Sequence, residues 1–229
     1  MYYNTDDYHP YLDKYPKHIA IVPDGGRRWA KEHGCTNYDA YLKSVELISQ
    51  IVLRVFAREA EIVTLFFAST SNFKRSSQEV EDFCSASWDF IKGKLLQLAL
   101  TNNFKIRIIR TDNQNFERFR ADALRIEKLT NGGKKTCNIC FNYNSLDEIQ
   151  KAAELAAQKG GHFLSFMQIP EPVDVLIRAG GANVLSNFLL PQLAAARLYF
   201  VDKLFNDLTL EDFDNYINHY TNTVLKYGE

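Results

Sequence analysis

Residues 18–29, HIAIVPDGGRRW, decide the fold class of this chain. The short, mostly apolar run HIAIV is typical of a buried strand, and Pro-Asp-Gly-Gly is typical of the tight loop that follows one. Residues 38–59 then place apolar side chains at helical spacing, which predicts an amphipathic helix. A strand, a polar loop and a helix thus form the first unit of an alternation that continues along the chain.

The alternation predicts a single α/β domain. The run IVTLFFAS at 62–69 is almost entirely apolar, as expected of a strand that is buried on both faces. Further strands are predicted at 104–109, 136–143, 173–178 and 197–201, and further helices at 77–100, 114–130, 145–158 and 209–226. Strands that alternate with helices form a mainly parallel central sheet covered by helices. We therefore expect an N-terminal tail at 1–16 and one domain at 17–229.

The composition is that of an ordinary folded protein. The 229 residues are 46% hydrophobic and carry 27 Lys and Arg against 28 Asp and Glu, a formal charge of −1. A chain without excess positive charge has no general attraction to nucleic acid. No apolar run reaches the roughly 18 to 20 residues of a transmembrane helix, and the start of the chain lacks the pattern of a signal peptide. We expect a cytoplasmic protein with no transmembrane segment and no nucleic-acid partner.

The four cysteines predict neither a redox motif nor a metal centre. Only Cys137 and Cys140 are close in sequence, within the predicted strand TCNICFNY. Side chains three residues apart on a strand point to opposite faces, so the two thiols are not expected to share a ligand. No second pair of Cys or His stands at the spacing of a zinc site.

Three polar loops follow predicted strands. They are PDGGRRW after the first strand, STSNFKR after the second and RAGGANVLSN after the fifth. In a parallel sheet the loops at the carboxyl ends of the strands meet at one edge, where ligands bind. Their Arg, Ser and Asn side chains suit phosphate oxygens. The loops predict a ligand that carries several phosphates, or two diphosphate ligands.

The first loop holds one carboxylate among phosphate-binding groups. Gly25 and Gly26 let backbone N–H groups approach a ligand, and Arg27 and Arg28 supply forked donors. Asp24 repels a phosphate unless a cation such as Mg²⁺ lies between them, so Asp24 is the predicted metal ligand. The alternative is a solvated Asp-Gly-Gly turn with two surface arginines.

The second loop also has two explanations. It ends a strand with hydroxyls, an amide and two cations, but Ser76 and Ser77 before Gln78 and Glu79 are also typical of a helix N-terminus. Both explanations can hold together. The apolar faces of helices 38–59 and 77–100 either enclose the apolar tail of a ligand or simply form core.

Three segments carry a resemblance to a known family: HIAIVPDGGRRWAKEHG, LFFASTSNFKR and VDVLIRAGGANVLSNFLLPQLAAARLYF. In that order they resemble motifs of the cis-prenyltransferases, the undecaprenyl diphosphate synthase family. The resemblance implies the cis-prenyltransferase fold and an enzyme that uses Mg²⁺ to join an allylic diphosphate to isopentenyl diphosphate. It also implies a homodimer or, in some lineages, a heterodimer.

The resemblance assigns roles to residues in all three loops. Asp24 matches the family's essential aspartate, which engages Mg²⁺ and the allylic diphosphate. Ser69 and Asn72 match polar residues between the two substrates and join Asp24 as the predicted catalytic residues. Residues that match diphosphate-binding positions are Gly25, Gly26, Arg27, Arg28, Arg75, Arg178 and Ser186, and Phe73 matches an aromatic residue of the site.

Several family positions are changed in this chain. Ala182 and Val184 replace a Glu and a phosphate-binding Arg, and Arg197 replaces a Glu that helps to hold Mg²⁺ at the second diphosphate. Other departures are Gly26, Asn37, Tyr41 and Ser71. We expect Arg197 to bind a diphosphate directly in place of the metal. The loop Pro-Asp-Gly-x-Arg-Arg-Trp resembles the lavandulyl-type branch, which performs irregular head-to-middle couplings, sometimes with cyclisation.

These features favour a prenyltransferase that acts on short allylic diphosphates such as dimethylallyl or geranyl diphosphate. The coupling is expected to be irregular or short-chain, with or without cyclisation. One alternative is a terpene-cyclase-like enzyme that acts on a single prenyl diphosphate. Another is a non-catalytic partner subunit, which the retained Asp24 and the C-terminal LKYGE, without an R-x-G ending, disfavour.

The substrate tunnel is predicted to be short. Phe67 stands where the family usually has a small Ala, and Phe141 stands where Ala is frequent. An added ring fills volume that a C5 unit needs, which limits products to about two or three C5 units. Trp29, Tyr41 and Phe73 complete the predicted tunnel. The alternative is that Phe67 and Phe141 only fill the core.

Overall fold

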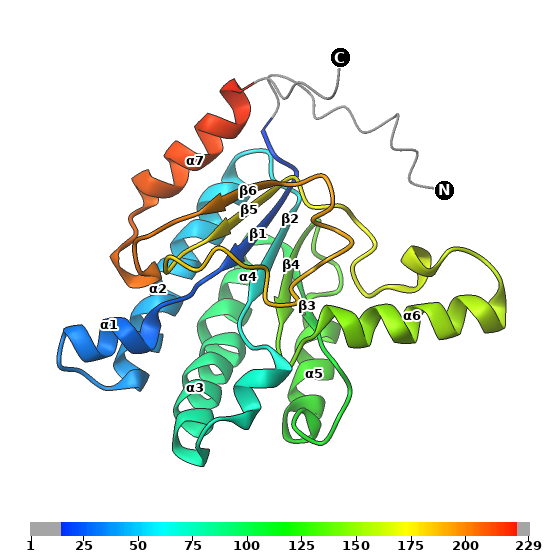
Figure 1. Cartoon of the computed structure of the whole chain (residues 1–229), viewed down its shortest axis with the longest axis horizontal. Helices are drawn as coiled ribbons and strands as arrows, with labels where there is room; N and C mark the ends of the chain where they lie inside the picture. The colour runs from blue at the N-terminus through cyan, green and yellow to red at the C-terminus, as the bar shows by residue number, and fades with distance from the viewer. Residues whose placement is uncertain (1–14, 224–229) are drawn as a thin grey trace.

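The computed structural model describes residues 15–223 and contains one six-stranded sheet (Figure 1). The strands are β1 (His18–Val22), β2 (Ile62–Phe66), β3 (Phe104–Ile109), β4 (Lys135–Cys140), β5 (Val175–Arg178) and β6 (Arg197–Phe200). Their order is β3-β4-β2-β1-β5-β6, and every pairing between neighbours is parallel. The predicted α/β domain with a mainly parallel sheet is confirmed. Because β1 lies between β2 and β5, the loops that follow these three strands are neighbours at one edge.

The helices also follow the predicted pattern, with two refinements. They are α1 (Gly26–Glu32), α2 (Asn37–Ala57), α3 (Ser77–Phe90), α4 (Leu96–Asn102), α5 (Arg120–Thr130), α6 (Ser145–Lys159) and α7 (Leu210–Asn222). The predicted helix 77–100 consists of α3 and α4, which are joined by one turn of π-helix at Ile91–Leu95. The predicted helix 114–130 begins later, at Glu117, with a short 3-10 helix that leads into α5. The predicted N-terminus at Ser76 is confirmed, since its hydroxyl accepts a hydrogen bond from the backbone N–H of Glu79.

The ends of the chain lie outside the described residues. These are residues 1–14 and 224–229, which include most of the predicted tail 1–16, the end of the predicted helix 209–226 and the C-terminal LKYGE. Within residues 15–223, no helix combines the length and the apolar character needed to cross a bilayer.

The two faces of the sheet are covered differently. Buried side chains of α2, α3, α4, α5 and α7 form one large core with residues of the strands. The opposite face packs against the stretch before β5 and the loop between β5 and β6, which contribute Ile169, Val173, Phe188, Leu189 and Leu193. Figure 1 shows helices α2 to α5 along one side of the sheet and the loop that joins β5 to β6 on the other. The larger, helix-covered core is the one that extends beneath the edge with the polar loops.

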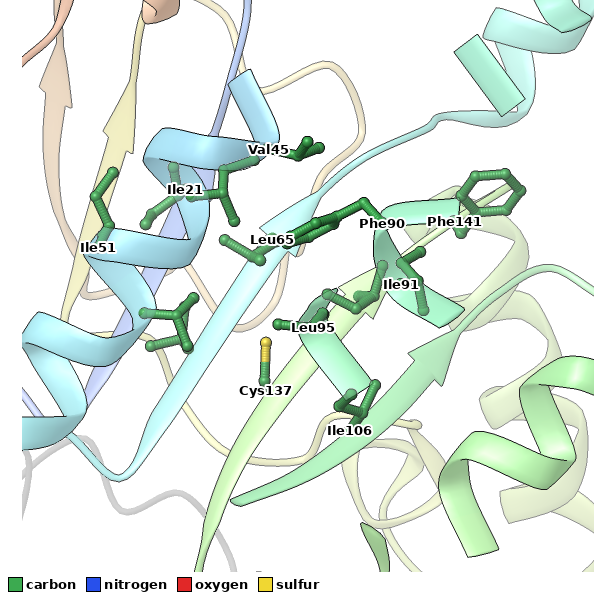
Figure 2. Close-up of a cluster of buried hydrophobic side chains, with 14 of the residues drawn as sticks. Ile21, Val45, Ile51, Leu65, Phe90, Ile91, Leu95, Ile106, Cys137 and Phe141 are labelled. Carbon is green, nitrogen blue, oxygen red and sulfur yellow. The ribbon is translucent and has the colours of Figure 1, made fainter. Parts of the chain in front are cut away.

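The centre of the helix-covered core is drawn in Figure 2. Leu65 of β2, Phe90 of α3 and Leu95 of the π-turn point toward one another there and are at most 5% exposed. Full burial of each such side chain contributes about 1.5 to 3 kcal/mol to folding. Cys137 belongs to this core, whereas Cys140 belongs to the opposite one, so the prediction that the two thiols lie on opposite faces is confirmed.

A chain of polar side chains crosses the sheet within the core. The His18 Nδ1 lies 2.8 Å from the carbonyl oxygen of Pro172, which can only accept, so this nitrogen carries the proton. The Nε2 then accepts from the Thr64 hydroxyl at 2.7 Å, and Thr64 accepts from the Asn138 amide at 3.0 Å. Burial lowers the pKa of His18 to about 4, although hydrogen bonds with the backbone oppose this shift.

This pKa makes stability depend on pH. An unfolded His has a pKa of about 6.5, so between pH 6.5 and pH 4 the unfolded chain binds a proton that the folded chain does not. We expect His18 to reduce the free energy of unfolding by about 2 kcal/mol between pH 7 and pH 5. Urea unfolding of the wild type and of His18→Gln at both pH values tests this. An equal decrease of the unfolding free energy in the wild type and in His18→Gln would show that His18 does not cause the pH dependence.

Candidate active site

A cavity of about 440 Å³ opens at the carboxyl ends of β1, β2 and β5. Its volume falls in the range of about 300 to 1,000 Å³ that is usual for small-molecule sites. One half is polar and is formed by the loops after the three strands, and the other is mostly apolar and lies between α2 and α3. The lining residues that this site shares with the sequence prediction are Asp24, Gly25, Gly26, Arg27, Arg28, Tyr41, Phe67, Ser69, Asn72, Arg75, Arg178 and Ser186.

The polar half is strongly cationic. Its wall contains the guanidinium groups of Arg27, Arg28, Arg75 and Arg178 and one carboxylate, that of Asp24. Four positive charges and one negative charge leave a local charge of +3, although the whole chain carries −1. This half of the cavity is therefore suited to a ligand group with several negative charges.

Arg178 connects the first and third loops. In the parallel register it pairs with Val22, so the residues that follow it lie beside Asp24. Its Nη2 donates to the Asp24 Oδ2 at 3.0 Å, and its Nη1 donates to the Val184 carbonyl at 2.7 Å and to the Ser186 hydroxyl at 2.9 Å. The side chain is only 7% exposed, and its Nε has no hydrogen-bond partner among the described residues. Arg178 thus holds both loops in place.

Two glycines allow close approaches of the backbone at this edge: Gly25 in the first loop lies against Leu204 after β6, and Gly180 in the third loop lies against the first. Gly25 has a φ of 108°, and a Cβ there would lie 2.8 Å from the Leu204 side chain. Gly180 has a φ of 86°, and a Cβ there would lie 2.7 Å from Arg28 Nη2 and 3.1 Å from the Asp24 carbonyl oxygen. No other residue fits either position without a shift of the neighbouring groups.

The second loop is shaped by its own side chains. The Asn72 Oδ1 accepts from the backbone N–H of Ser69 at 2.8 Å and from its hydroxyl at 2.9 Å. The Ser69 hydroxyl also lies 2.7 Å from that of Ser71. Ser69 and Asn72 therefore line the cavity and cap a short helical turn at the same time. Their predicted catalytic role stays a prediction.

Arg75 at the end of this loop is a partly desolvated cation. Burial is the largest cause that lowers the pKa of Arg75, and the nearby charge of Arg27 lowers it further. Tyr41, Glu79 and Asp24 act in the opposite direction. Two guanidinium groups that destabilise each other in this way favour an anion between them.

The other half of the cavity is walled by one face of each of two helices. Tyr41, Val45 and Ile48 are spaced by one helical turn along α2, and Phe83 and Ser87 are similarly spaced along α3. Burial raises the pKa of the Tyr41 phenol, which agrees with an apolar surrounding. The helix faces thus line the apolar half of the cavity and also form part of the core.

Aromatic rings form part of the cavity wall, and other rings stack against them. Phe67 stacks on Phe90 with a centroid distance of 6.1 Å, and Phe83 stacks on Phe141 at 5.8 Å. Phe67 lines the cavity together with Ser69, and its role as a limit of the substrate tunnel stays a prediction.

Three predicted tunnel residues do not line this cavity. Phe141 is fully buried and supports Phe83 from behind. Phe73 lines a second, more open groove that it shares with Arg75. Trp29 faces away from the cavity, stacks on His33 and donates to Asp207 at 2.7 Å. The spacing of aromatic residues along a helix or strand could not show which rings line the cavity and which pack behind its lining residues.

Arg197, which is expected from the sequence to bind a diphosphate directly, does not line this cavity. Arg197 pairs with Val175 at the start of β6, whereas the cavity lies at the other end, where Arg178 pairs with Phe200. Three residues of strand separate the two ends by about 10 Å. The guanidinium donates instead to the carbonyls of Tyr220 and Thr223 at 2.9 and 3.0 Å, at the end of α7.

The carboxylate of Asp24 can take part in a magnesium site. No group of three or more His, Cys, Asp and Glu side chains within residues 15–223 could hold a metal ion by itself. Mg²⁺ at phosphate sites uses one or two protein carboxylates and takes its other ligands from phosphate and water. The Asp24 Oδ2 is bonded to Arg178, but Oδ1 lies 3.7 Å from Arg28, beyond hydrogen-bonding distance, and keeps its capacity for a cation.

Comparisons with known proteins agree with this geometry. A family model described as a putative undecaprenyl diphosphate synthase matches residues 22–228. An isoprenyl transferase of Campylobacter jejuni (strain RM1221) is 30% identical over 219 residues, which cover 93% of this chain and 98% of the relative. The chain belongs to the undecaprenyl diphosphate synthase family. An isoprenyl transferase of Helicobacter pylori (strain J99) is 32% identical over 234 residues, with 95% and 99% coverage.

Solved structures of this family have the same fold. A lavandulyl diphosphate synthase from Lavandula x intermedia, in complex with dimethylallyl diphosphate, superposes with a TM-score of 0.83 at 27% identity. The match covers 90% of this chain and 95% of that one. A probable undecaprenyl diphosphate synthase from Campylobacter jejuni gives a TM-score of 0.76 at 28% identity, with 93% and 98% coverage. The predicted family and enzyme class are thereby confirmed: the chain is a prenyltransferase.

Sequence reasoning did not single out some residues of the site. The cavity-lining hydroxyls of Ser44 and Ser87 were not predicted, because small polar residues on an apolar helix face carry no specific signal. Glu79, which accepts from the Arg27 Nη1 at 2.8 Å, was noted only as part of a helix N-terminus. Glu79 and Arg27 are 52 residues apart in the chain, so no local sequence pattern could indicate that they pair.

Gly180 offers a test of how tightly the loops are held. We expect Gly180→Ala to destabilise the protein by about 1 to 3 kcal/mol, because the new Cβ meets Arg28 and alanine is strained at a positive φ. Thermal unfolding measures the effect. Gly132→Ala is the control, since a Cβ at Gly132 meets nothing within 4 Å. Equal melting temperatures of the two variants would contradict the close approach of the loops.

Proposed function

We propose that this enzyme couples short allylic diphosphates, such as dimethylallyl or geranyl diphosphate, in an irregular lavandulyl-type or short-chain reaction. The observation that carries the proposal is the aromatic part of the cavity wall, where Phe67 and Phe83 line the cavity and stack on Phe90 and Phe141. A growing chain of many C5 units needs an open tunnel, and close-packed rings do not yield that volume easily. The structural similarity to a lavandulyl diphosphate synthase supports the same substrate class.

The two halves of the cavity match the two halves of a prenyl diphosphate. The guanidinium groups around Asp24 suit the diphosphate, and the faces of α2 and α3 suit the hydrocarbon tail. Coupling breaks the bond between the allylic carbon and the diphosphate oxygen, and a new carbon–carbon bond forms to the second substrate, which then loses a proton. Negative charge therefore develops on the leaving diphosphate, where Arg27, Arg28 and Arg75 stabilise it.

Asp24 would hold Mg²⁺ through its Oδ1, and the metal would add positive charge at the leaving group. Arg178 keeps the Asp24 carboxylate in place through Oδ2. The apolar walls exclude water from the reacting carbon, which favours coupling over hydrolysis.

The proposal is tested by incubation of the purified protein with dimethylallyl, geranyl or farnesyl diphosphate, each with and without isopentenyl diphosphate and Mg²⁺. We expect coupled products of about two or three C5 units from the short substrates. Cyclised products from a single prenyl diphosphate would favour the cyclase alternative. Products of six or more C5 units would contradict the short-chain proposal, and absence of any product would favour a partner subunit.

Asp24→Asn tests the carboxylate without removing the oxygen that Arg178 needs. We expect turnover to fall by about 100-fold or more. The melting temperature should fall as well, because the buried Arg178 loses its charged partner. Steady-state rates with dimethylallyl diphosphate measure the loss. Asp89→Asn is the control, because Asp89 is an exposed residue of α3 whose contact is Lys92 at 3.6 Å. A rate within a few-fold of the wild type would remove Asp24 from the mechanism.

Phe67→Ala tests whether the aromatic part of the cavity wall limits product length. The variant removes the ring that stacks on Phe90, so we expect products longer by at least one C5 unit, or a gain in turnover with farnesyl diphosphate. Mass spectrometry of the products is the measurement. Phe163→Ala, in the short turn after α6 and outside the cavity wall, controls for the general loss of an aromatic ring. An unchanged product length in Phe67→Ala would contradict a limit set at this position.

We also propose that the protein is a cytoplasmic homodimer. The strand β6 is the last in the sheet order, and Leu198 on it is 39% exposed, which leaves an edge and an apolar side chain for a second copy. Light scattering after size exclusion measures the mass in solution.

A further inference from the structure

Glu79 pairs with Arg27, a residue that lines the cavity, and is held from two sides. It stands in the first turn of α3, and the Ser76 hydroxyl lies 3.2 Å from its Oε2. Its Oε1 accepts from the Arg27 Nη1 at 2.8 Å, which joins α1 to α3. The pKa of Glu79 is lowered, first by this bond with Arg27, then by Ser76, with a contribution from Arg75. The carboxylate is therefore ionised at neutral pH.

The partner of this carboxylate belongs to the predicted diphosphate site. Arg27 and Arg75 both line the cavity, and the pKa of Arg75 is lowered first by burial and then by the nearby charge of Arg27. Glu79 is an anion that offsets both charges. A carboxylate and a phosphate oxygen use the same donor geometry on a guanidinium group. The diphosphate and Glu79 therefore seek the same donors of Arg27.

We propose that Glu79 is an internal competitor of the diphosphate for Arg27, an inference that rests on the proposed function. In the free enzyme the carboxylate neutralises and orients Arg27. When the diphosphate binds, Arg27 exchanges Glu79 for phosphate oxygens, and Glu79 keeps its contact with Ser76. The pair is suited to exchange, because its side chains are 48% and 31% exposed and such pairs are weak. Glu79 thus limits affinity for the diphosphate and favours release of the product diphosphate.

The test compares binding of inorganic diphosphate by calorimetry at low salt. We expect Glu79→Gln to bind about two- to fivefold more tightly than the wild type, as expected from loss of an exposed ion pair. Glu81→Gln is the control: it removes the same charge two residues along α3, where Glu81 pairs with Arg118 at 2.8 Å and not with Arg27. In an Arg27→Ala background, the gain from Glu79→Gln should disappear.

Each result has a distinct meaning. In one outcome the wild type binds diphosphate normally, and Glu79→Gln binds it no more tightly than Glu81→Gln does. This result would leave the proposed diphosphate site standing but would contradict the competition between Glu79 and diphosphate. A gain that persists in the Arg27→Ala background would also overturn it, because the effect would then be general electrostatics. If neither the wild type nor any variant binds diphosphate, the proposed function itself fails.

Discussion

The site depends on the ion pair between Asp24 and Arg178. The guanidinium of Arg178 is almost fully buried, and a buried cation without a partner is strongly destabilising. Asp24 supplies that partner, and Val184 and Ser186 satisfy further donors. One side chain on β5 therefore sets the positions of the loop after β1 and of the loop after β5. The adjacency of the two strands in the sheet makes this possible.

The parallel sheet explains why the cavity has two unlike halves. Loops at the carboxyl ends of β1, β2 and β5 bring cations to the mouth, because all three strands end at the same edge. Below that edge, the side chains on one face of the sheet point into the core that α2 and α3 cover. A cavity that begins at the edge and extends between these helices must change from polar to apolar. This is the polarity of a prenyl diphosphate.

The local charge of the cavity wall, and not the net charge of the chain, indicates which ligand the site can bind. The formal charge of −1 excluded a general attraction to polyanions, yet the cavity wall alone carries +3. The excess is concentrated on Arg27, Arg28, Arg75 and Arg178, while most acidic residues lie elsewhere on the surface. Glu79 brings the mouth to +2, which moderates the repulsion between Arg27 and Arg75. A diphosphate that enters relieves the same repulsion, so binding and electrostatic relaxation are coupled.

The sequence by itself determined the strands, the helices, the parallel sheet and the three polar loops, because apolar periodicity and turn residues act over a few neighbouring positions. The chemistry of the first loop by itself predicted Asp24, Arg27 and Arg28 as site residues, motif resemblance then assigned them roles, and the structure places them in one cavity. Only the tertiary structure decided that Arg197 lies at the opposite end of its strand, that Phe141 supports the cavity wall from behind, and that Glu79 meets Arg27. These relations depend on strand direction, register and helix packing, which join residues far apart in the chain and leave no local pattern.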